Sequence, residues 1–300
     1  MSFPCELLTF SECRIPASMK KQRTVRRSVS ASGIGVFSGQ EVKLSLCPNE
    51  KETGIIFKRV DLPHQPELPA HLDSVQATPR CTVIGNDQIS IQTVEHLLSA
   101  LSAYGIDNAM IEISGSEVPI FDGSSLEFVD MIEKAGICEL SSEKKRYKIG
   151  TPLFWSKGDI HLIAVPSNEL RISYTLHYPH SSAIGTQYYS FLLSEEGFKK
   201  EIAPSRTFSV YEEIAPMIEK GLVKGGNLTN AVIIKDNQIL NSEGLRFSDE
   251  MVRHKILDLI GDLSLVPHQF LAHIIAIRSG HSSNNAFAKQ LYHQIKMECL

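Results

Sequence analysis

The stretch VRHKILDLIGD, residues 252–262, places charged residues and a histidine among leucines and isoleucines. A helix advances about 100° per residue, so the apolar residues share one side of a helical wheel: Val252, Ile256, Leu259 and Ile260. His254 and Asp258 project from the opposite side, one turn apart. This spacing suits two ligands of one metal ion, or an exposed pair that stabilises a helix by about 0.2–0.5 kcal/mol.

A second helix, predicted at residues 93–103, contains the similar motif TVEHLLSAL. Its apolar stripe consists of Val94, Leu97, Leu98 and Leu101. His96 lies on the far side of the wheel from this stripe, and Glu95 is next to His96. If the polar faces of the two helices meet, His96, His254 and Asp258 complete a three-ligand set of the kind found in catalytic zinc sites. Glu95 would then be available as a general base. Taken alone, Glu95 and His96 also fit an ordinary surface dipeptide.

Alternation of apolar and polar residues predicts strands from Glu41 onward and at 54–58, 109–113, 161–165, 231–234 and 273–277. A capping box of Ser124 and Glu127 predicts a helix that stops at Gly136. The polar stretch 139–146 resembles a linker, after which strands, a helix before Arg206 and a hairpin at AVIIKDNQIL follow. Ser248 is the expected N-cap of the 252–262 helix.

These elements predict an α+β fold with two similar domains, each a small, mainly antiparallel sheet layered with helices. The expected boundaries are 22–142 for domain I and 147–300 for domain II, with residues 1–21 forming a disordered N-terminal extension. The active site is expected between the two domains.

Composition excludes several classes of protein. The chain has 300 residues, 42% of them hydrophobic, and a formal net charge of -4, so a nucleic-acid partner is not expected. The one basic run, between Lys20 and Arg27, is interpreted as a solvated face. Neither a signal peptide nor a stretch of about 20 apolar residues is recognisable, so no integral membrane segment is expected. Six scattered cysteines without a CxxC pair favour a reducing compartment, hence a cytoplasmic protein.

Three further motifs carry weaker signals. In SGHSSNN, residues 279–285, small residues place His281 on a tight turn after a strand, where either a catalytic or a merely solvated histidine is common. In SRTF, residues 205–208, Thr207 offers a hydroxyl to an oxyanion. GIGVFSG, residues 33–39, lacks the third glycine of a dinucleotide-binding turn and precedes a strand, so it is interpreted as a strand-connecting turn.

Together, these motifs closely resemble one family, the bacterial UDP-3-O-acyl-N-acetylglucosamine deacetylases of lipid A synthesis. The resemblance runs from about residue 22 to residue 285 and rests on these stretches: QRTVRRSV, GIGVFSG, TVEHLLSALSAYGIDNA, EVPIFDGSS, SRTF, GLVKGGN, NSEGLRFSDEMVRHKILDLIGDL and SGHSSNN. It implies a zinc-dependent amidohydrolase that releases acetate from UDP-3-O-acyl-GlcNAc in the committed step of that pathway. It also implies two α+β domains that enclose the site, and a monomer.

The resemblance implies a role for each matching residue. His96, His254 and Asp258 would bind zinc, although two histidines and an aspartate also suit Fe²⁺. The implied catalytic roles are Glu95 as general base, His281 as cationic general acid, Asp262 as its orienting carboxylate and Thr207 as the oxyanion donor. The implied substrate contacts are Lys255, Phe208 on the sugar, and Ile214 and Val223 in the acyl-chain passage.

One departure and two alternatives accompany this interpretation. Phe37 stands where the family usually has a histidine near the site. The fold would also suit a zinc hydrolase acting on another N-acyl substrate, which a substrate panel would reveal. A non-catalytic binding protein of the same fold would be expected to lose Glu95 or His281, and both are present.

Overall fold

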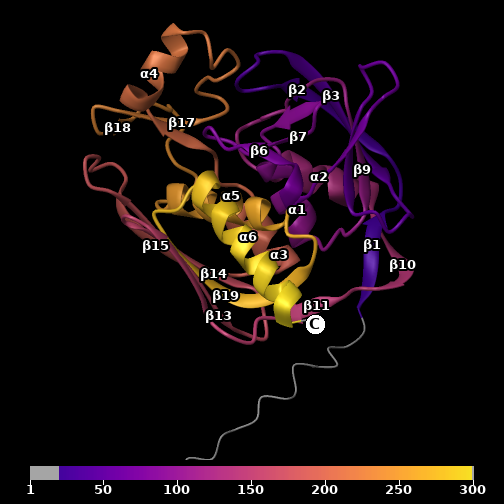
Figure 1. Cartoon of the computed structure of the whole chain (residues 1–300). Helices are drawn as coiled ribbons and strands as arrows, with labels where there is room; N and C mark the ends of the chain where they lie inside the picture. Colours follow the sequence, from indigo (N-terminus) through magenta and orange to yellow (C-terminus); the bar gives the residue numbers. More distant parts are fainter. Residues whose placement is uncertain (1–19, 299–300) are drawn as a thin grey trace, which may run out of the picture.

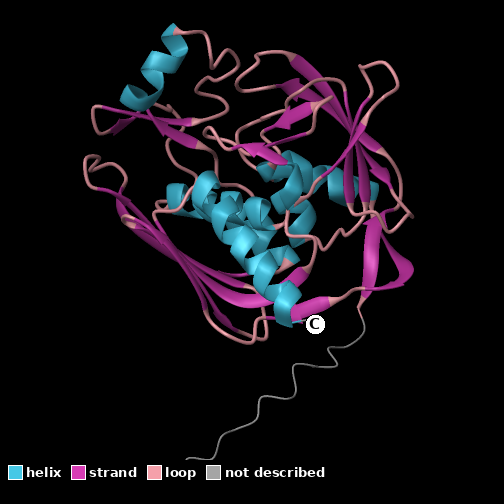
Figure 2. Cartoon of the chain, in the orientation of Figure 1, coloured by secondary structure: helices cyan, strands magenta, loops and turns pink. Residues whose placement is uncertain are grey.

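The computed structural model describes residues 20–298, which form two large sheets with helices between them (Figure 1). Figure 2 shows the main helices gathered in the centre, with strands on both outer sides and α4 (Tyr211–Glu219) standing apart at the upper left. The predicted α+β class is confirmed. None of the described helices is both long and apolar enough to cross a membrane.

The N-terminal half is built on a five-stranded sheet. Its strands lie in the order β2 (Val29–Ile34), β3 (Glu41–Pro48), β9 (Ala109–Ile113), β4 (Ile55–Arg59) and β5 (Glu67–Pro69). A smaller sheet contains β6 (Val75–Ala77), β7 (Val83–Gly85) and β8 (Ser90–Gln92). The helical elements of this half are η1 (Leu72–Ser74), α1 (Glu95–Ala103) and α2 (Leu126–Ala135). The GIGVFSG turn joins β2 to β3, as predicted.

The C-terminal half is built on a six-stranded sheet. Its strands are β12 (Leu153–Lys157), β13 (Ile160–Pro166), β19 (Gln269–Ile277), β14 (Arg171–Tyr178) and β15 (Gly185–Leu192), with β11 (Arg146–Lys148) beside β19. A small sheet holds β16 (Phe208–Val210), β17 (Val232–Lys235) and β18 (Gln238–Ile239). The remaining helices are α3 (Glu195–Gly197), η2 (Phe198–Ile202), α5 (Glu250–Leu263) and α6 (His281–Glu298). The predicted strands correspond to β3, β4, β9, β13, β17 and β19.

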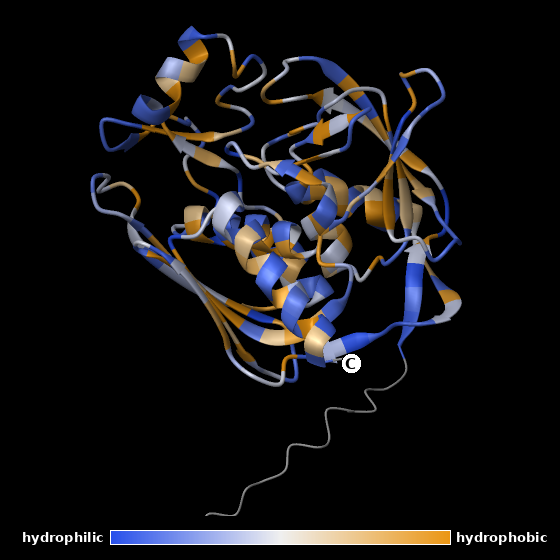
Figure 3. Cartoon of the chain, in the orientation of Figure 1, coloured by the Kyte–Doolittle hydropathy of each residue, from blue (hydrophilic) through white to orange (hydrophobic). Residues whose placement is uncertain are grey.

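The expected linker at 139–146 is wrong. Most of it belongs to β10 (Ile137–Glu143), which pairs antiparallel with β1 (Lys21–Val25). In the ladder Lys21 is opposite Glu143 and Arg23 is opposite Glu139, but the Lys21 side chain donates to the Ser141 carbonyl and Arg23 pairs with Glu195. Figure 3 shows β1 in hydrophilic colours. Residues 1–19 of the expected extension lie outside the described residues, and its last residue, Lys21, belongs to β1. The domain boundaries stay a proposal.

Both predicted helix caps are wrong. The N-cap of α5 is Asp249 instead of Ser248, and that of α2 is Ser125, in each case without a side-chain capping bond. The hydroxyl of Ser124 instead donates to Asp122 and accepts from the Leu126 N–H, so the expected reciprocal bond with Glu127 does not form. The end of α2 at Gly136, with a φ of 70°, is as predicted.

Helix α5 is the centre of the molecule. It packs against α1, α6 and β14, so almost all of its residues are buried, including both His254 and Asp258. The wheel had predicted one packed face and one open face. The polar face opens into a cavity, and α1 covers the rest of it from the N-terminal half.

Candidate active site

Close contact between α1 and α5 brings the two predicted metal-binding motifs together. Gly261 makes this contact possible, since a Cβ at that position would lie 2.2 Å from the backbone oxygen of Glu95. Real Cβ atoms do not approach an oxygen so closely, so a larger residue would push the helices apart. The start of α1, with Glu95 and His96, therefore lies directly against the second half of α5.

His96, His254 and Asp258 form a compact group of possible ligands. Their ligand atoms all lie within 4.8 Å of one another, and all three residues are buried. The Oδ1 atom of Asp258 lies 3.3 Å from Nε2 of His254 and 3.7 Å from Nε2 of His96. Among the described residues this is the one His/Cys/Asp/Glu group that is able to hold a metal ion. The spacing predicted from sequence is thus realised in space.

The chemistry of this group fits a divalent cation. Nδ1 of His254 lies 3.1 Å from the carbonyl oxygen of Ser205, and a proton donated there leaves the Nε2 lone pair facing the group. Burial, reinforced by His254, lowers the pKa of His96 to about 3, so its imidazole is neutral. Although burial opposes it, the neighbouring His254 and Lys255 hold the pKa of Asp258 well below its usual range. Two imidazoles and one carboxylate are a donor set that zinc accepts.

Glu95 and His281 lie beside this group and approach each other. Oε1 of Glu95 lies 3.7 Å from Nε2 of His281. Burial raises the pKa of Glu95 to about 7. Burial alone would lower the pKa of His281, but the negative charges of Asp262 and Glu95 raise it to about 10. At neutral pH, His281 is therefore cationic, and Glu95 is close to its titration midpoint.

The predicted tight turn around His281 is wrong, because His281 is the first residue of α6. The Asn284 N–H donates to the carbonyl of Gly280, which starts the helical hydrogen-bond pattern there. The predicted partner Asp262 is in place, with Oδ2 lying 2.9 Å from Nδ1 of His281. The side-chain amide of Asn284 donates to the same oxygen at 2.8 Å.

Sequence reasoning missed Thr82. Its hydroxyl donates to Oδ1 of Asp262 at 2.5 Å, and its backbone N–H donates to Oε2 of Glu95 at 3.1 Å. One residue thus contacts both the proposed base and the carboxylate behind the proposed acid. Nothing in the local pattern TPRCTV marks it, since its partners are far away in sequence.

Lys255 and Phe208 lie on the cavity side of the group. Nζ of Lys255 lies 2.8 Å from Oδ2 of Asp258 and 5.5 Å from the centre of the Phe208 ring. The pKa of Lys255 is raised: burial opposes this, but the charge of Asp258 outweighs it. Thr207 precedes Phe208, and its backbone N–H donates to the carbonyl of Gly123 in the other half of the chain.

A single cavity of about 1410 Å³ connects these residues. It is lined by every predicted site residue except Asp262: Glu95, His96, Thr207, Phe208, Ile214, Val223, His254, Lys255, Asp258 and His281. Asp262 lies behind His281 instead. Apolar residues on and beyond α4 line the same space, and Phe37 is also part of its wall. The cavity therefore combines a polar reaction centre with an apolar extension.

Comparisons with known proteins show the family to which this chain belongs. The family described as LpxC: UDP-3-O-acyl N-acetylglycosamine deacetylase matches residues 22–293. A Chlamydia pneumoniae protein named UDP-3-O-acyl-N-acetylglucosamine deacetylase is 50% identical over 93% of this chain and 99% of its own length. A protein of the same name from Chlamydia felis (strain Fe/C-56) is 47% identical over 92% of this chain and 99% of its own length. Another, from Chlamydia trachomatis serovar L2, is 48% identical over 93% of this chain and 97% of its own length.

The family match extends past Asn285, where the resemblance had been expected to end, and includes most of α6. This extension is consistent with the packing of α6 against α5. The match over most of the chain, together with relatives of such identity, makes this protein an enzyme, a deacetylase that belongs to the UDP-3-O-acyl-N-acetylglucosamine deacetylase family.

Proposed function

We propose that this enzyme hydrolyses the acetamide of UDP-3-O-acyl-N-acetylglucosamine and releases acetate in the committed step of lipid A synthesis, using zinc held by His96, His254 and Asp258. The names of the relatives support the substrate. The site observation that carries the proposal is the pairing of a carboxylate and a cationic imidazole, 3.7 Å apart, beside three buried ligands. A cytoplasmic monomer, as expected from sequence, is part of the proposal.

The metal has a defined role in this proposal. When bound, zinc supplies Lewis acidity, which lowers the pKa of water and polarises a carbonyl. The ligands belong to two helices, and the hydrogen bond from His254 to Ser205 orients one of them. The same donors suit Fe²⁺, so metal exchange belongs in the test.

Glu95 acts as the general base and takes a proton from the water that attacks the amide carbon. Its pKa of about 7 suits this role, because a base titrating near the working pH combines availability with proton affinity. The Thr82 N–H holds Oε2 of Glu95. Oε1 is the atom nearer to His281, and it is the better placed to reach the water.

His281 acts as the general acid and protonates the leaving amine, which an amide needs because an amide anion leaves poorly. Its Nδ1–H is directed to Asp262. The proton on Nε2 therefore points toward Glu95 and the cavity. Because Glu95 must be deprotonated and His281 protonated, the rate should fall at both low and high pH.

The remaining wall residues would bind the substrate. The Thr207 hydroxyl would stabilise the oxyanion, and Lys255 and Phe208 would contact the sugar nucleotide. Ile214 and Val223 would contact the 3-O-acyl chain, because both line the apolar part of the cavity. Lys255 forms an ion pair with Asp258, so it would contact the substrate and this metal-ligand carboxylate together.

An assay of acetate release tests this proposal directly. Chelator-stripped protein is assayed with UDP-3-O-acyl-GlcNAc before and after addition of one equivalent of Zn²⁺, with Fe²⁺ in a parallel sample. We expect turnover only after metal is added. Folded, metal-loaded protein that releases no acetate would refute the proposed substrate, and a panel of other N-acyl substrates would then identify the alternative. Full activity in the stripped protein would refute the metal dependence.

A further inference from the structure

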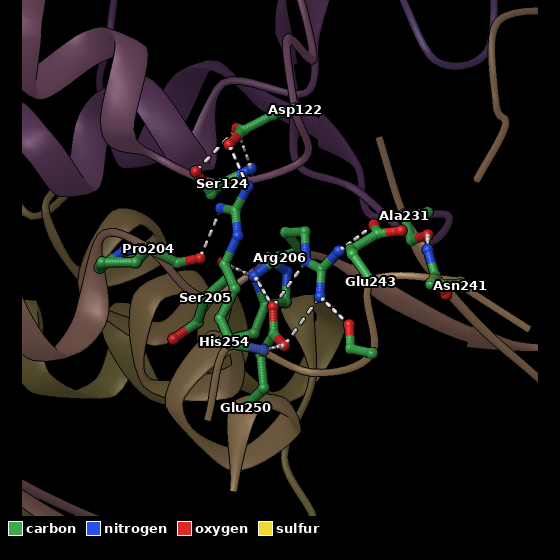
Figure 4. A network of polar contacts seen from close by, with 12 residues as sticks. Asp122, Ser124, Pro204, Ser205, Arg206, Ala231, Asn241, Glu243, Glu250 and His254 are labelled. Atoms are coloured by element: carbon green, nitrogen blue, oxygen red, sulfur yellow. Dashed lines mark hydrogen bonds and ion pairs between the residues drawn. The ribbon is translucent and has the colours of Figure 1, made fainter. Parts of the chain in front are cut away.

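A buried ion pair between Arg206 and Glu250 joins the segment before β16 to the start of α5. Arg206 has an exposed fraction of 2% and Glu250 of 0%. Figure 4 shows the guanidinium of Arg206 between Glu250 and Glu243, with Ser205 and His254 alongside. Neither acidic residue lines the cavity, so this network lies outside the reaction centre.

Glu250 is surrounded by donors. Oε1 accepts from the backbone N–H and Nε of Arg206 at 2.9 and 2.8 Å. Oε2 accepts from Nη2 of Arg206 at 3.1 Å and from the Arg246 N–H at 2.7 Å. Glu243 accepts from Nη1 of Arg206 and the carbonyl of Gly244 accepts from its Nη2, each at 2.7 Å. A two-point Arg–carboxylate contact fixes direction as well as distance.

This contact closes a ring that includes a proposed metal ligand. Glu250 and His254 lie one turn apart on α5. Ser205 directly precedes Arg206, and its carbonyl accepts from Nδ1 of His254 at 3.1 Å. The Ser205 carbonyl and the Arg206 N–H belong to one peptide group. Displacement of this group would therefore move the carbonyl, and the His254 ring would rotate.

We propose that Arg206 and Glu250 are positioning residues for the metal centre, which hold the Ser205 carbonyl against His254 so that its Nε2 faces His96 and Asp258. This inference rests on the proposed function, because it assumes that the three residues bind a metal. Partners behind metal-bound histidines typically contribute about 10–100-fold to metal affinity. The ion pair would act through such a partner, one bond further from the metal.

The test measures metal binding instead of turnover. Glu250→Gln keeps the size of the side chain but cannot accept all four N–H groups, and Arg206→Lys keeps the charge but loses the fork. The full-length apo variants are titrated with Zn²⁺ against a chromophoric chelator. Their Co²⁺ forms are examined by visible absorption, which reports ligand geometry. We expect Zn²⁺ affinity about tenfold or more below that of the parent protein, and a changed Co²⁺ spectrum.

A control variant separates positioning from charge. Asp249→Asn also removes one negative charge, one residue away at the N-cap of the same helix. Its carboxylate pairs with Arg253 at 2.6 Å instead of with the Arg206 segment. We expect Asp249→Asn to bind Zn²⁺ like the parent protein. An equal loss of affinity in Asp249→Asn and Glu250→Gln would overturn the proposal in favour of a general charge effect.

The remaining outcomes are also decisive. Variants that unfold at lower temperature but keep the Zn²⁺ affinity and Co²⁺ spectrum of the parent protein would show a purely structural ion pair, contrary to the proposal. If Glu250→Gln does not fold, Glu243→Gln replaces it, since that side chain is 55% exposed and contacts only one arm of the guanidinium. It should give a smaller loss in the same direction, and no loss would refute the inference. A parent protein that binds no metal would instead refute the proposed function.

Discussion

His96 and His281 line the same cavity and are both buried, yet their surroundings favour opposite charge states. Burial and the neighbouring His254 lower the pKa of His96 to about 3. Burial also acts against protonation of His281, but Asp262 and Glu95 overcome it and raise the pKa to about 10. The two histidines differ in what surrounds Nδ1. Nδ1 of His281 lies 2.9 Å from a carboxylate, whereas Nδ1 of His96 has no hydrogen-bond partner among the described residues.

In the proposed function, this contrast would let one residue type serve two roles. A metal ligand must be neutral, and a general acid must carry a proton, so each environment prepares its histidine for one task. Asp258 belongs to both environments, because it lies 3.7 Å from His96 and 3.9 Å from His281. A variant at Asp258 therefore acts on both sides of the contrast, whereas variants at Asp262 and Thr82 act on the His281 side.

The largest effect is expected from Asp258→Asn. The change removes the only anionic donor of the proposed set and leaves the amino group of Lys255 without its partner. Metal affinity should fall by more than the about 10–100-fold typical of outer partners, and acetate release should drop to background. Metal content after gel filtration, measured by elemental mass spectrometry, checks the first point. Normal zinc content with normal turnover would remove Asp258 from the ligand set.

Glu95→Gln should stop catalysis without disturbing metal binding. The amide keeps the shape of the side chain and cannot take a proton, so kcat should fall by about 10²–10⁴-fold. The measurement pairs kcat with Zn²⁺ affinity, and only kcat should change. A comparable loss of Zn²⁺ affinity would instead assign Glu95 to the metal.

Asp262→Asn should make His281 more like His96. The change removes the negative charge that outweighs burial, so the pKa of His281 falls, and the cationic acid is lost at lower pH. The alkaline limb of the kcat/KM profile, expected near pH 10 from the pKa of His281, should therefore move down by about 1–3 pH units. His281→Gln serves as the control, because it should lower the whole profile and remove this limb. An unchanged limb in Asp262→Asn would mean that another group sets it.

The α+β class and the spatial grouping of His96, His254 and Asp258 could be predicted from the sequence, but some elements of the framework could not. Glu95, His96, His254 and Asp258 could be found because helical periodicity relates each of them to its own apolar stripe. The strand β10 was mistaken for a linker, because its partner β1 is more than a hundred residues away and alternation in a polar edge strand is weak. The two-sided burial of α5 was also hidden, since a wheel cannot show that a second helix covers the polar face.

Thr82 illustrates the same limit and provides the smallest expected effect. Thr82→Val keeps the shape of the side chain and the backbone N–H to Glu95, but it removes the hydroxyl bond to Asp262. A hydrogen bond to a charged group is worth about 1.5–3 kcal/mol, so the free energy of unfolding should fall by an amount of that order.

Asp262 becomes a stronger base without this donor, and the pKa of His281 should rise. The alkaline limb should then move upward, opposite to its movement in Asp262→Asn. Movement in the same direction in both variants would show that Thr82 acts on His281 directly, at the 3.4 Å separation of its Oγ1 from Nδ1, and not through the carboxylate.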